Sequence, residues 1–406
     1  MEQPSLQHKI INDPVYGFIT INHPLIFNII AHPYYQRLRR IHQMALAYLV
    51  YPGAVHTRLH HSLGAYHLMC MAINELKLKG VDITLEEEIA TKAAILLHDI
   101  GHGPFSHALE EEFLSGIDHE TLGLHIMNKM NVEFNGALDL CINIFQNKYH
   151  KKFLHQLISG QLDVDRMDYL TRDSYFTGVS EGVIGYDRII KMLVVHNNEL
   201  MVEEKGIYSI EKFLIARRLM YWQAYLHKAV LAGEEMLVKI LKRVKELCLT
   251  DKDSVKTGSG TDYFLFEFNG VLNDDVVHKF CQIDDIDFEF AIKKWSSHAD
   301  IILSTLCKGI LNRKLYKVRF QSEEIDNDLL EKKQAALAQE FNVNKADSNY
   351  LAFTGSISNT IYKTDDEKIN ILFKDGSVKD ISSIDNTLIH KTITNPVKKF
   401  YICSIL

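Results

Sequence analysis

Residues 93–113, AAILLHDIGHGPFSHALEEEF, place His98, Asp99, His102 and His107 at the end of an apolar helical run. Polar groups in such surroundings cost free energy unless each one finds a partner. A lone histidine on an apolar helix is most often a hydrogen-bonded structural residue, whereas an adjacent histidine and aspartate more often mark a site. The pattern therefore predicts a helical protein with a functional centre at this helix end.

The chain has 406 residues, which is more than one compact core usually holds. From Pro24 to about Leu247 nearly every segment has helical periodicity. Residues 250–262 are polar, contain glycine and lack periodicity, which indicates a boundary. We therefore expect a mainly α fold, with a helical catalytic domain over residues 1–250 and a smaller α/β domain over residues 251–406 for an interface or for regulation.

The helix that leads to the histidine cluster has a clear predicted start. Thr84 and Glu87 have the three-residue spacing of a capping box, so we expect a helix from Thr84 that delivers His98 and Asp99 at its end. Other expected elements are a hairpin over residues 9–22, helices over residues 59–80, 209–247 and 323–340, and strands over residues 314–320 and 369–381.

Composition excludes several classes of protein. The formal net charge of −7 argues against a protein that coats nucleic acid or an anionic membrane. The N-terminal residues lack the apolar core of a signal peptide, and no run of 18 apolar residues occurs. Six scattered cysteines without a C-x-x-C pair fit reduced thiols. We expect a soluble cytoplasmic protein without a membrane or nucleic-acid partner.

Histidine is locally enriched. The chain has 20 histidines, and nine of them fall within one stretch of about 70 residues, so the excess points to a site and not to a general bias. These nine are His56, His60, His61, His67, His98, His102, His107, His119 and His125.

Three separated segments carry candidate metal ligands: residues 56–64, 98–103 and 162–173. Two imidazoles and two carboxylates without a thiolate suit a divalent ion such as Mn, Fe, Co, Ni or Zn, with Mg as a further candidate. We expect one tightly bound ion, and a second ion with substrate. The predicted ligands are His61, His98, Asp99 and Asp165.

Several motifs occur in a fixed order: KIINDPVYG, TRLHHSLG, HDIGHGPFSH, the His119-Glu120 pair and DVDRMDYLTRD. In this order they resemble the HD-domain phosphohydrolases, and most of all the branch that acts as deoxynucleoside triphosphate triphosphohydrolases. The similarity extends over residues 9 to about 235. The resemblance implies an HD-domain helical bundle and a nucleotide substrate.

The resemblance also implies a reaction. A metal-activated water would attack the α-phosphorus of a deoxynucleoside triphosphate, releasing deoxynucleoside and inorganic triphosphate, and the four predicted ligands match the family's metal positions. His102, His107, His119 and Glu110 stand where the family keeps its phosphate-contacting and proton-donating residues. Histidine fits both roles because its pKa lies near neutrality; which histidine is the acid stays open.

Further positions match the family's substrate pocket. The resemblance implies that Gln43 reads the sugar near its 3′-hydroxyl, and that Tyr225 closes the sugar pocket against a 2′-hydroxyl. An ordinary packing or capping role is the alternative for each of these residues. The remaining candidates are Tyr169 and Asp173 as sugar and base contacts, and Arg58, Arg166 and Lys228 as phosphate cations.

The chain departs from the family pattern at a few positions. Arg166 replaces a lysine, and Glu110 replaces an aspartate. In the segment that forms the family's guanine-nucleotide regulatory pocket, Gln36 and Arg39 are kept but Ala31 stands in place of a guanine-reading aspartate. Without that carboxylate, guanine loses the acceptor for its N1 and N2 donors. We therefore predict no strict dependence on GTP.

Two other functions compete with this interpretation. One is a different HD-type nucleotide phosphohydrolase, either a monophosphatase or a phosphodiesterase. The second is a nucleotide-sensing oligomeric scaffold with weak activity, although the complete metal set argues against it. The resemblance implies a homo-oligomer, either a dimer or a tetramer.

Overall fold

The computed structural model describes residues 9–105, 109, 112–114, 116–360, 362, 367–384 and 396–405. The described chain begins with an antiparallel hairpin of β1 (Lys9–Asp13) and β2 (Gly17–Ile21), as the alternation predicts. The protein is mainly α-helical, which confirms the predicted fold class. All six cysteines are free thiols.

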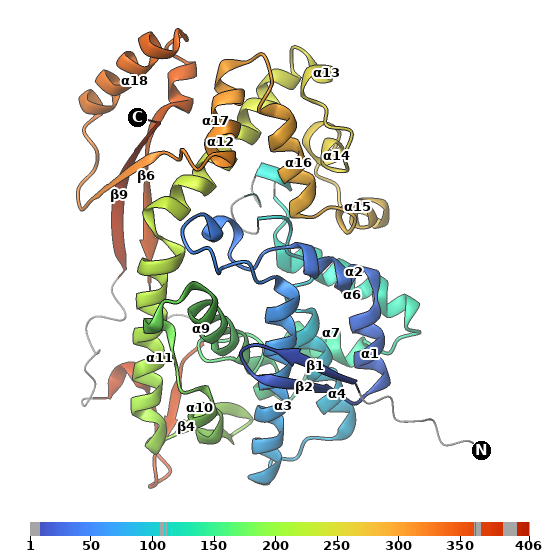
Figure 1. Ribbon diagram of the computed structural model, residues 1–406. Helices are drawn as coiled ribbons and strands as arrows, with labels where there is room; N and C mark the ends of the chain where they lie inside the picture. Colours follow the sequence, from blue (N-terminus) through green and yellow to red (C-terminus); the bar gives the residue numbers. More distant parts are fainter. Residues whose placement is uncertain are drawn as a thin grey trace.

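The helical body is arranged around α3 (Arg58–Leu78), which packs against α4 (Leu85–Leu97) on one side and α9 (Val164–Thr177) on another (Figure 1). Short 3-10 helices at Arg37–Arg40 and Ala45–Leu49 precede α3. The other helices of this region are α1 (Pro24–Ala31), α2 (Pro33–Gln36), α6 (His119–Glu133), α7 (Asp139–Phe145), α8 (Lys152–Gln156), α10 (Tyr186–Met192), α11 (Ile207–Met220) and α12 (Lys228–Cys248).

Helix α4 brings the histidine motif into the interior. It begins with the predicted capping box, in which the Thr84 hydroxyl accepts from the Glu87 amide and the Glu87 carboxylate accepts from the Thr84 amide. Its apolar residues Ala93–Leu97 are fully buried, so the helix end that carries His98 lies inside the molecule. The capping box thus fixes the start of a helix whose last turn presents the candidate ligands.

The turn after α4 needs glycine because another backbone lies against it. A Cβ atom at Gly101 would lie 2.0 Å from the His119 carbonyl oxygen and 2.4 Å from the Gly123 nitrogen. The missing side chain at Gly101 therefore lets the start of α6 approach the histidine motif. This approach stacks the rings of His102 and His119, with centroids 4.0 Å apart.

The predicted continuous helix over residues 209–247 is wrong. Helix α11 ends at Met220, a π-helical turn spans Tyr221–Tyr225, and α12 begins at Lys228. Tertiary hydrogen bonds hold this turn in place. One of them is donated by the Tyr225 hydroxyl to Asp173 in α9. Single π-helical turns often lie at functional sites, and sequence periodicity alone does not reveal them.

A second hairpin also interrupts the predicted helical run. Strands β3 (Leu193–His196) and β4 (Glu199–Glu203) pair in antiparallel fashion. Asn197 and Asn198 form the turn, with φ values of 51° and 65°. Asparagine tolerates this left-handed backbone, so the Asn-Asn pair was the available turn signal.

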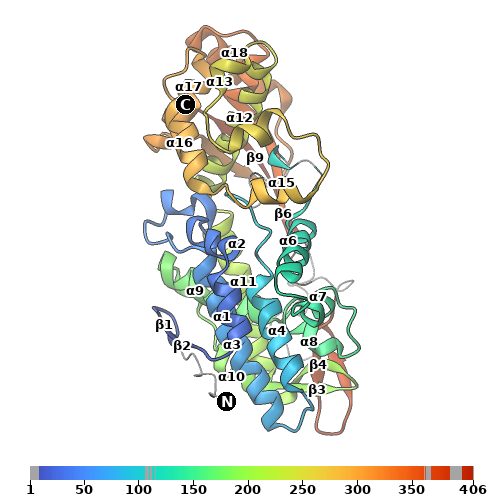
Figure 2. The ribbon, with the colours of Figure 1, turned by 90° about the vertical axis from the view of Figure 1, so that its right-hand side faces the viewer.

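The C-terminal region contains helices and two sheets, as expected for a mixed α/β segment. One sheet has the order β5-β9-β6 and is antiparallel; its strands β6 and β9 are labelled in Figure 2. Its strands are β5 (Lys317–Gln321), β6 (Ala352–Asn359) and β9 (Val397–Ser404), and the helices are α13 (Lys252–Val255), α14 (Thr261–Phe266), α15 (Asp274–Phe280), α16 (Asp285–Trp295), α17 (Ile301–Leu311) and α18 (Asn327–Phe341).

The C-terminal chain also returns to the helical body. Strands β7 (Asn370–Leu372) and β8 (Val378–Asp380) form an antiparallel hairpin within the predicted strand segment 369–381, and β7 pairs in parallel with β4. Figure 2 shows this red segment beside β3 and β4, far from α18. The division at residue 250 stays a prediction, and this pairing crosses it. Among the described residues, no helix is both long and apolar enough to cross a membrane.

Candidate active site

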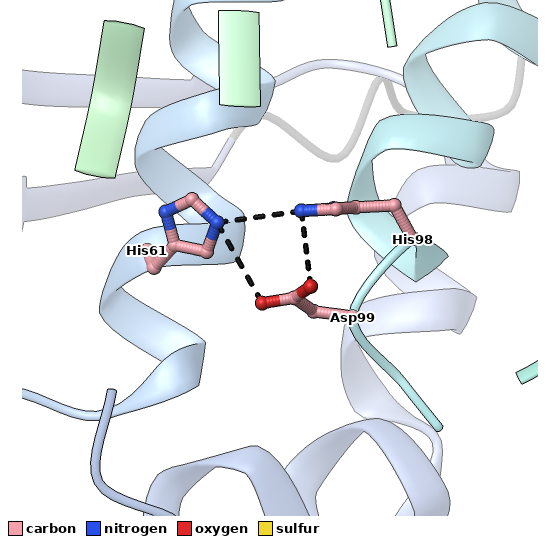
Figure 3. A group of neighbouring side chains, drawn as sticks. All are labelled: His61, His98 and Asp99. Atoms are coloured by element: carbon pink, nitrogen blue, oxygen red, sulfur yellow. Dashed lines mark hydrogen bonds and ion pairs between the residues drawn. The ribbon is translucent and has the colours of Figure 1, made fainter. Parts of the chain in front are cut away.

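The ends of three helices bring four predicted metal ligands together. His61 comes from the first turns of α3, and His98 and Asp99 follow the last turn of α4. The Nε2 atoms of His61 and His98 lie 3.3 Å apart, and Asp99 carboxylate oxygens lie 3.6 Å from His61 and 3.3 Å from His98 (Figure 3). These three residues therefore form a group that could hold a metal ion.

Asp165 approaches the same group from α9. Its Oδ1 atom lies 3.0 Å from His61 Nε2 and 3.4 Å from His98 Nε2. The Asp163 side chain caps α9 by accepting from the Arg166 amide at 2.7 Å, which places Asp165 in the first helical turn. Asp165 thus completes a set of two imidazoles and two carboxylates.

The spacing and orientation of these atoms fit a divalent ion. Atoms that bind one ion at about 2.1 Å lie roughly 3.0 to 3.4 Å apart, which matches the shortest distances above. The other nitrogen of each ring is already engaged: His61 Nδ1 donates to Asp168 at 2.7 Å, and His98 Nδ1 donates to the Ile95 carbonyl at 2.6 Å. The Nε2 lone pairs of both rings therefore face one point, and a cation at that point would stabilise this arrangement.

The charges around this point are negative. Burial alone would raise the pKa of Asp165, but hydrogen bonds with His61 and His98 hold it well below its usual range. Burial opposes a charge on His61, yet Asp165 and Asp168 raise the pKa of His61 to about 10. The carboxylates therefore favour a positive charge between them, as a metal site requires.

A chain of buried ion pairs supports the candidate ligand His61. Asp168 accepts from Arg172 at 3.0 Å, and Arg172 donates to Asp13 of β1 at 2.8 Å. A Cβ atom at Gly64 would lie 2.0 Å from Asp168 and 2.1 Å from Arg172, so α3 needs glycine here. Sequence reasoning did not assign Asp168, Arg172 or Asp13; the i,i+4 spacing of Asp168 and Arg172 was the available signal.

A cavity of about 520 Å³ opens over the metal ligands. Its wall includes predicted ligands and most of the predicted catalytic and substrate residues within the described part of the chain. The predicted residues on this wall are His98, Asp99, Asp165, His102, His119, Gln43, Arg58, Tyr169, Asp173 and Tyr225.

One end of the cavity combines histidines with an arginine. Arg58 donates to the Asp99 carboxylate at 2.5 Å, and His102 Nε2 lies 3.5 Å from Asp99. Burial and the nearby Arg58 charge lower the pKa of His102 well below its usual range. Buried Arg37, which sequence reasoning missed, donates to the carbonyls of Ile100 and His102 at 2.9 Å and fixes this turn. Donors and proton carriers thus gather beside the metal ligands.

The aromatic end of the cavity carries groups suited to a sugar. Asp173 accepts from His56 and from the Tyr225 hydroxyl, each at 2.7 Å. The Tyr169 ring packs edge-on to the Tyr225 ring. Gln43 Oε1 is buried and has no hydrogen-bond partner among the described residues. Gln43 also lines the cavity, so a bound molecule that reaches its amide can donate to this acceptor.

Among the residues that the structure describes, three predicted site residues are not on the cavity wall: His61, Arg166 and Lys228. Arg166 donates to the Gly160 carbonyl at 2.6 Å, and the Lys228 ammonium lies 6.0 Å from the centre of the Phe320 ring. Arg166 and Lys228 are therefore engaged with other parts of the protein. His107 and Glu110 lie outside the described residues.

Two family matches cover the part of the chain that carries the candidate metal ligands and the π-helical turn. The sequence matches the HD domain over residues 58–173 and the HD associated region over residues 184–265. The first match contains all four candidate metal ligands. The second contains the π-helical turn and all of α12.

Individual relatives extend over most of the chain. A solved phosphohydrolase structure from Bacteroides thetaiotaomicron has 48% identity and a TM-score of 0.92, covering 98% of this chain and 100% of that chain. YwfO of Bacillus subtilis (strain 168) is 32% identical over 93% of this chain and 87% of that protein. The deoxynucleoside triphosphate triphosphohydrolase SAMHD1 of Gallus gallus is 30% identical over 58% of this chain and 45% of that protein.

Proposed function

This chain belongs to the HD-domain phosphohydrolase family, and from this premise we infer that it hydrolyses deoxynucleoside triphosphates to deoxynucleoside and inorganic triphosphate. One observation carries the proposal: two histidines and two aspartates converge at a cavity of about 520 Å³ whose other end offers an unpartnered Gln43 acceptor. Metal-binding and sugar-binding chemistry thus share one cavity.

The metal would be held by His61, His98, Asp99 and Asp165. When bound, a divalent ion lowers the pKa of water and stabilises charge on a phosphoryl oxygen. Nitrogen and oxygen ligands without thiolate favour Mn, Fe, Co, Ni or Zn. Asp168 would keep the His61 ring in the orientation that leaves Nε2 free for the ion.

The phosphates would bind at the histidine end. Arg58 is anchored on Asp99 and lines the cavity, so its guanidinium is placed to contact phosphate oxygens. His102 and His119 line the same wall, and a histidine there can give a proton to the departing 5′-oxygen of the sugar; because its lowered pKa makes His102 hold a proton poorly, His119 is the better candidate of the two. His107, in the same motif, is a third candidate for this proton.

The deoxyribose would bind between Gln43, Tyr225 and Asp173. Gln43 Oε1 would accept a hydrogen bond from the 3′-hydroxyl and so gain the partner that it lacks in the protein without ligand. The Tyr225 ring would close the 2′ side of the sugar, and its bond to Asp173 holds the ring in place. A 2′-hydroxyl would then meet the tyrosine, which favours deoxynucleotides over ribonucleotides.

Product analysis tests this function. The protein loaded with Mn²⁺ is incubated with each of the common deoxynucleoside and ribonucleoside triphosphates, and Asp99→Ala serves as the inactive control. We expect deoxynucleoside and inorganic triphosphate from the deoxynucleotides, and no product in the variant. Intact triphosphates under all conditions would overturn the proposal and redirect the search to nucleoside monophosphates.

We also propose that the protein forms a homo-oligomer, a dimer or a tetramer, as SAMHD1-like relatives lead us to expect. Light scattering coupled to size-exclusion chromatography measures the mass of the particle. The mass of a single chain of 46.7 kDa would contradict this proposal.

A further inference from the structure

One carboxylate on the cavity wall has no role in the mechanism above. Glu234 lies in the second turn of α12, one turn after Val230, and both residues line the cavity. The Glu234 side chain makes no hydrogen bond or ion pair with any residue that the structure describes. Its neighbour Glu235, in contrast, accepts from the Tyr401 hydroxyl at 2.6 Å.

The lack of a partner for the Glu234 carboxylate costs free energy in the protein without ligand. Burial and the adjacent charge of Glu235 raise the pKa of Glu234 to about 7. A partly buried carboxylate without a partner loses hydration and gains nothing in return. A ligand that brings hydrogen-bond donors to this wall would recover that free energy.

The parts of a nucleotide differ in what they can offer Glu234. The triphosphate is an anion that a carboxylate repels, and its cationic partners would be Arg58 and the metal ion that the candidate ligands would hold. The deoxyribose would already find its partners in Gln43, Tyr225 and Asp173. The nucleobase remains, and its edge carries the donors that a carboxylate accepts.

We propose that Glu234 reads the edge of the nucleobase and makes guanine the preferred base and thymine the least preferred. This inference rests on the proposed function. Guanine presents the N1 and N2 donors side by side, so they can form two parallel hydrogen bonds with one carboxylate. Adenine and cytosine offer an amino group beside a ring acceptor. Thymine offers one N–H between two carbonyl oxygens, which a carboxylate repels.

The kinetic test compares kcat/KM for the four deoxynucleoside triphosphates in the wild type, Glu234→Gln and Glu235→Gln. An amide has one acceptor and one donor, so E234Q should lower the ratio of guanine to thymine on the order of 10- to 100-fold. E235Q is the matched control: it removes the neighbouring charge that raises the pKa of Glu234 and keeps the Glu234 carboxylate, so guanine should stay at least as strongly preferred over thymine as in the wild type. An unchanged ratio in E234Q would overturn the inference.

A binding measurement separates this inference from the proposed function. Calorimetry measures the affinity of α,β-methylene analogues of the guanine and thymine deoxynucleotides, which need no turnover. If no triphosphate is hydrolysed but the guanine analogue binds more tightly and E234Q abolishes the difference, the proposed function fails and the inference stands. If hydrolysis occurs while both analogues bind equally, the inference fails alone.

The metal content of each variant completes the test. Elemental analysis of E234Q should give the same ion stoichiometry as the wild type and E235Q. A loss of metal confined to E234Q would make Glu234 a metal-binding residue and overturn its assignment to the base.

Discussion

His61 Nδ1 lies 2.7 Å from Asp168 Oδ2, and both side chains are almost entirely excluded from solvent. Asp168 is held in turn by Arg172, which pairs with Asp13 in the first strand. A ligand on α3 is therefore oriented through α9 by a residue far away in the sequence. Partners of this kind fix which ring nitrogen faces a metal ion.

Asp168→Asn should weaken metal binding while leaving all four predicted ligands in place. The amide cannot supply the negative charge that favours the Nδ1–H tautomer of His61, so we expect metal affinity to fall on the order of 10- to 100-fold. Titration with Mn²⁺ measures this affinity at a temperature where the variant is folded. Asp187→Asn, at an exposed position on α10, is the control. Equal affinities in both variants would contradict the role of Asp168.

Tyr225→Phe should weaken the binding of deoxynucleotides more than it slows the chemical step. The change removes the hydroxyl that donates to Asp173 at 2.7 Å and frees the ring to move. A lost hydrogen bond of this kind costs about 0.5 to 1.5 kcal/mol, so KM should rise roughly 2- to 10-fold. Steady-state kinetics measures KM and kcat separately. Tyr175→Phe changes an exposed tyrosine on α9 and should leave both constants unaltered.

GTP should not be required for activity. A second cavity of about 380 Å³ lies between β1, α1 and α3, and Ala31, Gln36 and Arg39 line it. Gln36 accepts from Arg39 and donates to the Ile30 carbonyl, both at 2.6 Å, so its amide is already satisfied. Ala31 offers no carboxylate to guanine.

Rates measured with and without GTP should therefore differ by less than the roughly 5-fold that marks the lower end of typical allosteric coupling. The substrate used for this comparison should lack guanine, so that it cannot act as its own activator. Activity that appears only after GTP is added would contradict the prediction.

The group of candidate metal ligands could be predicted from the sequence because its members lie in short motifs. His98 and Asp99 are adjacent and end a helix with a clear capping box, and both lie where the motif predicts. Glu234 carried no such signal, since its isolation depends on what surrounds it in three dimensions. The same is true of Arg37, which reaches the histidine motif across the fold.

The break between α11 and α12 shows a second limit. Periodicity over residues 209–247 continues through the break because the side chains on both sides pack into the same core. What interrupts the helix is a set of tertiary contacts, among them the bond from Tyr225 to Asp173. Local sequence patterns do not contain such contacts. Sequence-based prediction of secondary structure is therefore expected to fail most often at functional sites, where tertiary contacts override the local pattern.

Glu87→Gln should destabilise the helix that carries His98. The Glu87 carboxylate accepts from the Thr84 amide at 2.9 Å, from Tyr149 at 2.7 Å and from Lys151 at 2.8 Å. Burial would raise the pKa of Glu87, but the hydrogen bonds from Lys151 and Tyr149 outweigh it and lower the pKa. Because one buried charged partner is removed, we expect a loss of about 1 to 3 kcal/mol in the free energy of unfolding.

The sign of the pH dependence follows from the lowered pKa. A carboxylate with a depressed pKa stabilises the folded state above its unfolded pKa of about 4.5, and this contribution is lost as pH falls through the folded value. Urea denaturation should therefore show a gap between wild type and E87Q at neutral pH that narrows over the acidic range, as pH falls below about 4.5. Glu86→Gln, at the exposed neighbouring position, should show no such gap. A constant gap across this range would mean that Glu87 acts through packing, because a packing contact does not depend on the charge of the carboxylate.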